Sequence, residues 1–345
     1  MDMKQILPAL LALWGCLILL PVAMAGIAPK SAEENPGYME TGEEQMDSSQ
    51  DGSVTIEVYD IQSNQVRSMT LREYLVGVVA AEMPASFEVE ALKAQAVAAR
   101  SDALSRMQKN TDDEKIYEAH QGADVCTSPG HCTAWMDEGA RRQLYGDFFE
   151  TYEAKIRSVV EETDGQIAVY DEQPIVAVFH STSSGRTESA QDVWGSDVPY
   201  LQSVDSPGEE ASPRYESQVF VTAEEFVSQL AVACPGITVP DSIQQWVGDV
   251  VRSEAGGVES IVLCGQNFTG TQVREMFDLR STNFTVTVQE DGLNFDVLGY
   301  GHGVGLSQYG ANYMAQQGSS WEDIITWYYT GVSIGSIADI WPEDV

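Results

Sequence analysis

Residues 5–29 contain no charged side chain, and this apolar run constrains the chain more than any other feature of its sequence. About 20 apolar residues are enough to cross a bilayer as a helix. Lys4 precedes the run and a series of acidic residues follows it. Residues 1–4 are therefore predicted to be a cytoplasmic tip, and the chain after the run to be extracytoplasmic. We predict a single-pass transmembrane anchor in the cell membrane. An Ala-Met-Ala sequence at 23–25 is typical of signal-peptidase sites, so cleavage is the alternative.

An acidic segment separates this run from the globular part of the chain. Residues 30–52 contain Pro, Gly, Ser and many carboxylates but few apolar side chains, which predicts a disordered linker. Residues 53–345 are predicted to form one large domain. The whole chain carries 18 Lys and Arg against 53 Asp and Glu, a net charge of −35. This balance excludes nucleic acid as a partner, because phosphate backbones are bound by basic surfaces.

The domain is predicted to be α+β with mostly antiparallel sheet, because strands and helices do not alternate regularly enough for a doubly wound fold. Predicted helices cover residues 71–84, 88–107, 146–163, 222–230, 271–278, 306–318 and 320–329. Predicted strands cover residues 54–60, 166–170, 174–179, 200–204, 216–221, 247–253, 258–264, 283–289 and 293–299.

Two charged residues lie on the apolar stripes of the first two predicted helices. Glu82 continues the stripe formed by Leu71, Leu75 and Val78, and Arg100 lies on the core-facing line of the second helix. One interpretation is a buried ion pair between Glu82 and Arg100. The other is a carboxyl whose pKa is raised by loss of solvent, as suits a general acid. The two interpretations conflict, because a close Arg would lower the pKa of that carboxyl.

Two His and two Cys residues fall close together in a loop that contains Gly and Pro. They are His120, Cys126, His131 and Cys132. Thiolate and imidazole are ligands of tetrahedral zinc, and four protein ligands close the site, so the spacing predicts structural zinc. The alternative is a disulfide between the two Cys, which is plausible outside the cytoplasm.

The other two His lie in polar motifs that contain Gly. One motif spans residues 179–188 and the other is GHGVGLSQYG at 301–310. A Ser close to a His suggests a serine hydrolase, but neither motif contains the G-x-S-x-G sequence of a nucleophile elbow. The second motif lacks the Lys of a phosphate-binding loop. Tight turns with hydrogen-bonded His side chains are the simpler interpretation of both motifs.

Three blocks of this sequence together resemble the SpoIID/LytB family. They are residues 75–100, residues 179–188 with 193–195, and residues 302–310 with 327–332. The resemblance extends over residues 53–335. The chain departs from the family pattern at Ser101-Asp102, where Thr-Tyr is usual, and at Ser184-Gly185, where two Gly are usual.

The resemblance implies a lytic transglycosylase, which cleaves peptidoglycan glycan strands between MurNAc and GlcNAc and leaves 1,6-anhydro-MurNAc ends. It implies that Glu82 is the catalytic acid and base, and that the His–Cys loop is a zinc site. The substrate contacts that it suggests are Arg100, Phe179, Ser183, His302 and Gln308. Aromatic side chains that could stack on sugars are Trp194, Tyr200 and Tyr309.

The resemblance further implies action on peptide-stripped glycan at the septal or engulfing membrane during spore engulfment. The implied partners are an amidase and a membrane scaffold protein. Some relatives bind the wall and stimulate an amidase without cleaving glycan, so a non-enzymatic amidase enhancer is the alternative function. A zinc-dependent hydrolase is disfavoured, because four protein ligands leave no open position on the metal.

Overall fold

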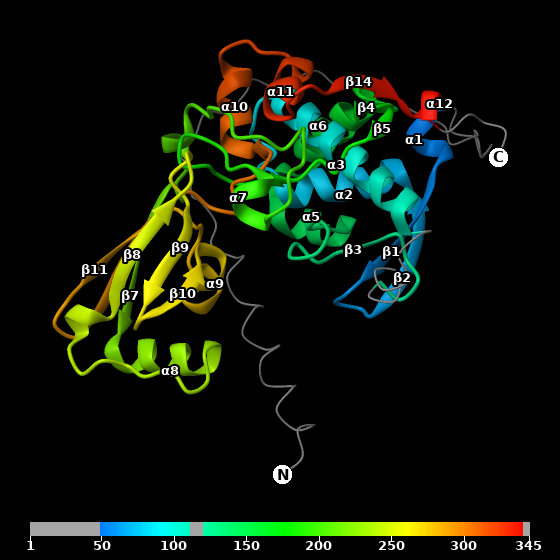
Figure 1. Cartoon of the computed structure of the whole chain (residues 1–345). Coiled ribbons are helices and arrows are strands. Elements are labelled where there is room, and N and C mark those ends of the chain that lie inside the picture. The colour runs from blue at the N-terminus through cyan, green and yellow to red at the C-terminus, as the bar shows by residue number, and fades with distance from the viewer. Residues whose placement is uncertain (1–48, 111–119, 341–345) are drawn as a thin grey trace. The chain divides into compact units, whose positions relative to one another are not determined.

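The structure is a computed structural model that describes residues 49–110 and 120–340 (Figure 1). The predicted cytoplasmic tip (1–4), the predicted anchor (5–29) and most of the predicted linker lie outside the described residues. Across the two described ranges, no helix combines the length and the apolar character needed to cross a membrane.

The described part of the chain combines helices with small sheets, which confirms the predicted α+β class. The helices are α1 (Gln50–Ser53), α2 (Leu71–Glu82), α3 (Val89–Asn110), α5 (Glu138–Tyr145), α6 (Phe149–Glu162), α7 (Ala190–Trp194), α8 (Ala223–Ala233), α9 (Gly270–Met276), α10 (Gln308–Gln316), α11 (Trp321–Tyr328) and α12 (Ile337–Ile340). Short 3-10 helices are η1 (Gly146–Phe148), η2 (Glu209–Ala211) and η3 (Ile243–Gln245).

The strands form sheets that are mostly antiparallel, as predicted. They are β1 (Thr55–Asp60), β2 (Gln65–Thr70), β3 (Val125–Cys126), β4 (Gln166–Tyr170), β5 (Gln173–Pro174), β6 (Phe179–His180), β7 (Glu216–Thr222), β8 (Val247–Arg252), β9 (Val258–Leu263), β10 (Gln266–Thr269), β11 (Phe284–Val288), β12 (Gly292–Leu298), β13 (Leu306–Ser307) and β14 (Ser333–Ser336). Strand orders are β2-β1-β3, β10-β9-β8, β11-β12-β7, β13-β6 and β14-β4-β5. The parallel pairs are β1 with β3 and β6 with β13.

Helices α2, α3 and α6 pack against one another around the first of two hydrophobic cores (Figure 1). The side chain of Thr70 caps α2 by accepting a hydrogen bond from the N–H of Glu73. Helix α2 ends just before Pro84, whose ring cannot continue a helix. Helix α3 is rich in Ala, the residue with the highest helix propensity. The predicted helices 71–84 and 88–107 are therefore confirmed.

The folded domain begins earlier than predicted. Helix α1 is capped by Ser49, and the side chain of Asp51 is fully buried. The Arg100 guanidinium donates to both carboxylate oxygens of Asp51, at 2.8 and 2.6 Å. Asp164 accepts hydrogen bonds from the backbone N–H groups of the first turn of α1. The prediction that the linker extends to residue 52 is therefore wrong, because the residues around Asp51 belong to the core.

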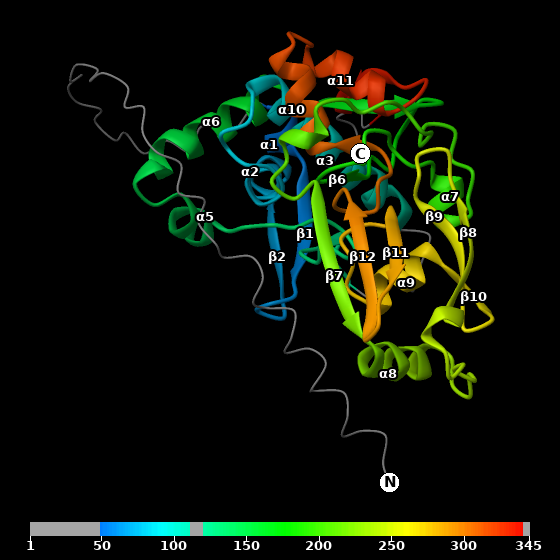
Figure 2. The same ribbon diagram turned by 90° about the vertical axis from the view of Figure 1, so that its left-hand side faces the viewer.

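A second hydrophobic core lies among strands β7 to β12 and helices α8 and α9. Figure 2 shows β7, β12 and β11 side by side, in the order that their backbone hydrogen bonds require. Phe226 of α8 stacks on Trp246 with ring centroids 4.8 Å apart and on Phe277 at 5.6 Å. Thr222 and Thr269 begin α8 and α9 with capping boxes.

Two predicted strands are not formed. Residues 174–179 are in strands only at their two ends, and residues 200–204 form no strand. Their backbone groups instead bond to turns: the N–H of Val178 donates to the carbonyl of Val176, and the carbonyl of Leu201 accepts from α7. The predicted helix 306–318 is divided into β13 and α10.

Candidate functional site

Glu82 is the last residue of α2, at the point where the helix ends and the chain turns toward Pro84. Its side chain is half-buried. The backbone N–H of Ala134 donates to Oε1 at 2.7 Å, and Nε2 of Gln308 lies 3.4 Å from Oε2. The carboxyl therefore has a partner on each oxygen, one from the loop before α5 and one from the start of α10.

Gln308 connects the second glycine motif to this carboxyl. It is the first residue of α10, which Ser307 caps by accepting a hydrogen bond from Gly310. The side-chain amide of Gln308 is buried and also donates to Oε1 of Gln95 at 3.3 Å. Gln95 comes from α3 and is fully buried. Two sequence blocks that lie far apart in the chain thus meet at Glu82.

The surroundings of Glu82 favour its protonated form. Burial raises the pKa of Glu82 above its ordinary value, and the hydrogen bonds from Ala134 and Gln308 oppose that shift only in part. No Lys or Arg of the described residues forms an ion pair with this carboxyl. A carboxyl that holds its proton at higher pH than usual is suited to donate it to a leaving oxygen.

Arg100 does not lie at this site. Its side chain is fully buried, and besides Asp51 it donates to the backbone carbonyls of Gln166 and Val160. No surface of the guanidinium is left to contact a substrate. The predicted substrate contact is therefore corrected to a structural role. The buried Glu82–Arg100 pair is also wrong, because Asp51 takes the place of Glu82.

The four residues of the His–Cys loop come together into one cluster. One ligand atom from each of them lies within 4.8 Å of the other three. Nε2 of His120 and Nδ1 of His131 are 2.8 Å apart, and Sγ of Cys132 lies 3.4 and 3.5 Å from these two nitrogens. Cys126 and Cys132 are free thiols, not a disulfide.

This cluster fits a metal ion. Tetrahedral zinc, with bonds of about 2.0–2.3 Å, holds its ligand atoms roughly 3.3–3.8 Å apart. The sulfur–nitrogen distances in the cluster fall in that range, with Sγ of Cys126 3.8 Å from Nδ1 of His131, whereas the two ring nitrogens, 2.8 Å apart, are closer than a bound ion would hold them. The remaining ring nitrogen of His120 is buried without a hydrogen-bond partner. Two thiols and two imidazoles thus form a group that could hold a metal.

The segment that follows the cluster runs along α2 to Glu82. The hydroxyls of Tyr74 and Thr133 are 2.8 Å apart, and the N–H of Met136 donates to the carbonyl of Gly77. The indole of Trp135 packs on Gly77 so closely that a Cβ there would lie 2.2 Å from its nitrogen. The segment is therefore seated on the helix at several points, and Ala134 lies between them.

His302 and Phe179 are joined through the backbone. The N–H of Val304 donates to Nδ1 of His302 at 3.1 Å, so Nε2 carries the proton and donates to the carbonyl of Phe179 at 3.0 Å. Burial and the charge of Arg274 lower the pKa of His302 to about 4. Both ring nitrogens are therefore occupied, and only the ring surface is left for a ligand. The side chain of Trp194 is 46% exposed, and its ring centroid lies 5.3 Å from that of His302.

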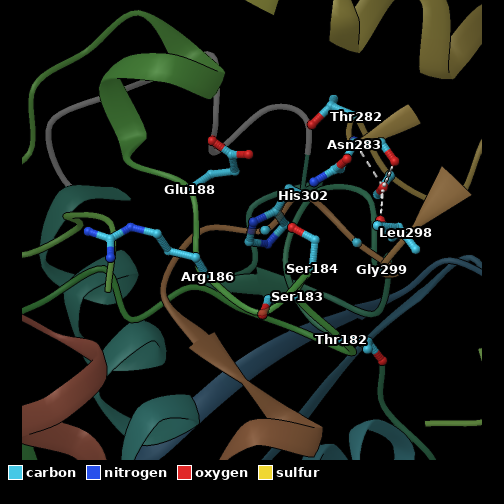
Figure 3. A pocket seen from close by; sticks show the side chains of 13 residues that line it. Thr182, Ser183, Ser184, Arg186, Glu188, Thr282, Asn283, Leu298, Gly299 and His302 are labelled. Atoms are coloured by element: carbon cyan, nitrogen blue, oxygen red, sulfur yellow. Dashed lines mark hydrogen bonds between the residues drawn. The ribbon is translucent and has the colours of Figure 1, made fainter. Parts of the chain in front are cut away.

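A small polar pocket lies beside His302 (Figure 3). The side chain of Arg186 extends away from His302 (Figure 3). Its guanidinium donates to Asp205. Ser183 also lines the pocket but is buried, and its hydroxyl donates to Glu209 at 3.0 Å. Its hydroxyl oxygen accepts from the N–H of Gly185. The hydroxyl of Ser183 therefore has partners inside the protein, and its contact with substrate stays a prediction.

Of the predicted stacking residues, Trp194 has the most open surface. Tyr200 accepts a hydrogen bond from the N–H of Val176 and packs against the first core. Tyr309 lies edge-on to Phe87, with ring centroids 5.0 Å apart.

Comparison with known proteins places the chain in a family. The family model described as stage II sporulation protein matches residues 59–170. The stage II sporulation protein D of Bacillus subtilis is 38% identical over 282 residues, which cover 81% of this chain and 79% of that protein. This chain belongs to the SpoIID family. The protein of the same name from Bacillus amyloliquefaciens is 36% identical over 292 residues, which cover 81% of this chain and 78% of that protein.

A more distant relative carries a different name. The amidase enhancer of Bacillus subtilis is 25% identical over 317 residues, which cover 76% of this chain and 40% of that protein. The SpoIID family model spans Glu82, Arg100 and the His–Cys cluster, whereas Phe179, His302 and Gln308 lie beyond it. The structure joins the two parts of the chain through the contact between Gln308 and Glu82.

Two groups of this site, the Ala134 N–H on Glu82 and the Gln95 amide on Gln308, were not predicted from the sequence. The donor from Ala134 is a backbone N–H, for which side-chain identity gives no signal. Gln95 could have been found, because it is a polar residue next to the apolar stripe of the second helix.

Proposed function

We propose that this chain is a lytic transglycosylase that cleaves peptidoglycan glycan strands between MurNAc and GlcNAc. The observation that carries the proposal is the environment of Glu82: a half-buried carboxyl with a raised pKa, held by Ala134 and Gln308. Membership of a family of sporulation proteins supports a role in the remodelling of the wall during spore engulfment.

Glu82 serves as both acid and base in the proposed reaction. Oε1 accepts the short hydrogen bond from Ala134, so the proton to be delivered is assigned to Oε2, beside the Gln308 amide. Oε2 gives this proton to the glycosidic oxygen while the bond to C1 of MurNAc breaks and an oxocarbenium-like centre forms. The carboxylate then accepts the proton of the MurNAc 6-hydroxyl as that oxygen bonds to C1. The product is the 1,6-anhydro sugar.

One carboxylate is enough for this sequence of steps. Glycoside hydrolases use a second carboxylate as base or nucleophile. Among the described residues, the hydrogen-bond partners of Glu82 are amide groups. An internal hydroxyl as nucleophile agrees with such a site. In this scheme Trp194 offers a stacking surface for a sugar, and Phe179 and His302 contribute the wall beside it.

Zinc is the metal that we assign to His120, Cys126, His131 and Cys132. A zinc ion with four protein ligands has no open position, so it would supply structural cross-linking of the loop and no Lewis-acid chemistry. The role of the loop itself is to seat residues 133–136 on α2 and to aim the N–H of Ala134 at Glu82.

The products of digestion test the proposal. Intact sacculi and sacculi stripped of stem peptides by an amidase are digested in parallel with the purified exported domain, and the released fragments are weighed. We expect 1,6-anhydro-MurNAc ends and faster release from the stripped glycan. Reducing ends, which retain the water, would indicate a hydrolase. Equal rates of formation of anhydro ends from both substrates would support the cleavage reaction but contradict the preference for peptide-stripped glycan.

A non-enzymatic amidase enhancer is the second candidate, and the name of the 25% identical relative favours it. The two functions differ in what purified protein does alone. An enhancer releases nothing from either substrate but accelerates the release of stem peptides when an amidase is added. In either case we propose that residues 5–29 anchor the domain at the outer side of the cell membrane, near an amidase and a membrane scaffold.

A further inference from the structure

Glu209 is a fully buried carboxyl that the proposed reaction does not use. It lies in η2, outside the sequence blocks that suggested a function. Burial raises the pKa of Glu209 to about 7, although several hydroxyls oppose the shift. A buried carboxyl is costly unless its oxygens are hydrogen-bonded, so its partners indicate what it is used for.

Among the described residues, the side chains that donate to Glu209 are hydroxyl groups. Ser183 donates to Oε1 at 3.0 Å and Ser206 donates to the same oxygen at 2.5 Å. The Ser206 hydroxyl also lies 2.6 Å from the hydroxyl of Tyr328, a residue of α11 that is itself fully buried. One carboxyl therefore ties three segments together inside the first core.

The first turn of α10 packs directly on this network. A Cβ at Gly310 would lie 2.1 Å from the hydroxyl of Tyr328, 2.4 Å from that of Ser206 and 2.8 Å from Oε1 of Glu209. These distances leave room only for Gly at position 310. The network thus sets how deeply the start of α10 sits in the protein.

The same turn of α10 carries Gln308 to Glu82, since the amide Nε2 lies 3.4 Å from Oε2 of that carboxyl. We propose that Glu209 is a positioning residue: through Ser206, Tyr328 and Gly310 it holds the start of α10, and with it the Gln308 amide, against Glu82. The inference rests on the proposed function only in treating Glu82 as the reacting acid. It adds a group that touches neither substrate nor Glu82.

The proposal has a consequence that packing alone would not produce. The groups that face Glu82 and act on its charge are the Ala134 N–H and the Gln308 amide, and both lower its pKa against the effect of burial. If Glu209 holds Gln308 in place, removing the Glu209 carboxylate removes one of these two contributions. The pKa of Glu82 then rises, although Glu209 does not touch it.

The test measures the pKa of Glu82 by carboxyl carbon-13 NMR in the folded exported domain. The variants are Glu209→Ala, Gln308→Ala and the double variant, with Glu210→Ala as the control, because Glu210 is the exposed neighbour in η2. We expect Glu209→Ala and Gln308→Ala to raise the pKa of Glu82 alike, and the double variant to raise it no further, because the two act through one contact. Glu210→Ala should leave it unchanged.

Turnover on peptide-stripped glycan provides the second readout. A displaced Gln308 misplaces the acid, so Glu209→Ala should lower kcat by at least about tenfold with KM changed less than about twofold. An unchanged pKa of Glu82 in folded Glu209→Ala, or shifts that add in the double variant, would overturn the proposal. If Glu209→Ala does not fold, Ser206→Ala takes its place, with a smaller shift in the same direction expected and no shift overturning it. Because the NMR titration needs no substrate, it tests the positioning role of Glu209 even if the wild-type protein cleaves no glycan.

Discussion

At the scale of single residues, Glu82 is distinguished by where α2 ends. A carboxyl one turn earlier, at Val78 or Val79, or one residue later, at Met83, would be buried in the apolar core. At the last helical position it is half-buried, and it accepts hydrogen bonds from Ala134 and Gln308. The site thereby combines a raised pKa with a fixed carboxyl orientation, two properties that an acid catalyst needs together.

Replacing the proton donor should stop the reaction and leave the fold. Glu82→Gln keeps the size of the side chain but has no acidic proton, so we expect turnover on peptide-stripped glycan to fall by at least ~10²–10⁴-fold. Glu73→Gln, on the exposed face of the same helix, is the matched control and should cleave at the wild-type rate. Wild-type turnover by folded Glu82→Gln would end the assignment of Glu82 as the acid.

The pH dependence of cleavage follows from the direction of the same pKa. Burial raises the folded pKa of Glu82 above its ordinary value, so the protonated, active form persists to higher pH than for an exposed Glu. Activity should be flat below the folded pKa and decline as pH rises through it. The alkaline limb should move to higher pH in Gln308→Ala, since the amide lowers that pKa. A limb that moves to lower pH would contradict this account of the site.

Residue-level prediction from the sequence succeeded where periodicity was the evidence and failed where a distant partner decided the outcome. Helical spacing correctly placed Arg100 on a buried line. It could not identify Asp51 as the partner, because Asp51 lies in a segment with the composition of a linker. For Ser183, the family resemblance suggested a substrate contact but could not show that its hydroxyl donates to Glu209, a buried residue outside every motif.

At the scale of elements, the segment 133–136 acts as a bridge between the His–Cys cluster and α2. Its position depends on the absence of a side chain at Gly77, where Trp135 and the carbonyl of Met136 approach the helix. The helices at 71–84 and 88–107 were predictable because periodicity, propensity and Pro84 agreed. The absence of strands at 174–179 and 200–204 was not predictable. The backbone of an apolar extended segment can form hydrogen bonds with a turn as well as with a neighbouring strand.

A methyl group at Gly77 should displace this bridge. In Gly77→Ala the new Cβ would lie 2.2 Å from the Trp135 nitrogen and 2.8 Å from the carbonyl of Met136. We expect the segment to move and the Ala134 hydrogen bond to lengthen, with turnover reduced at least about tenfold. Gly139→Ala in α5 is the control, because its Cβ meets only an ordinary contact at 3.4 Å. Full turnover by Gly77→Ala would show that the bridge does not position Glu82.

The His–Cys cluster should carry one zinc per chain, and its loss should act first on stability. Cys126→Ser removes a ligand; if the site contributes about 3 kcal/mol, Tm should fall by roughly 6–12 °C. Cys234→Ser, at the end of α8 and outside the cluster, should retain both zinc and Tm. Metal analysis and calorimetry measure both. Metal-free wild-type protein with an intact Cys126–Cys132 disulfide would exclude the site.

At the scale of the whole molecule, the candidate site is built on the first of the two hydrophobic cores. The first core carries Glu82, the metal-capable cluster and Gln308, whereas the second is built from β7 to β12 with α8 and α9. The irregular order of the expected strands and helices predicted the α+β class and the antiparallel sheets. Composition could not show where the folded domain begins. The residues around Asp51 have the composition of a linker, but the buried carboxylate of Asp51 makes them part of the fold.

The beginning of the domain provides the last prediction. A chain that begins at residue 54 lacks α1 and leaves the Arg100 guanidinium buried without its carboxylate, whereas one that begins at residue 47 retains Asp51. Breaking a buried pair by removing one partner costs about 3–5 kcal/mol, so urea unfolding should show the shorter chain to be less stable by that amount. Asp51→Asn in the longer chain should lose part of the same stability. Arg100→Met in the shorter chain should recover part of it, because the unpaired charge is then gone. Equal stability of the two chains would mean that α1 is not part of the folded domain.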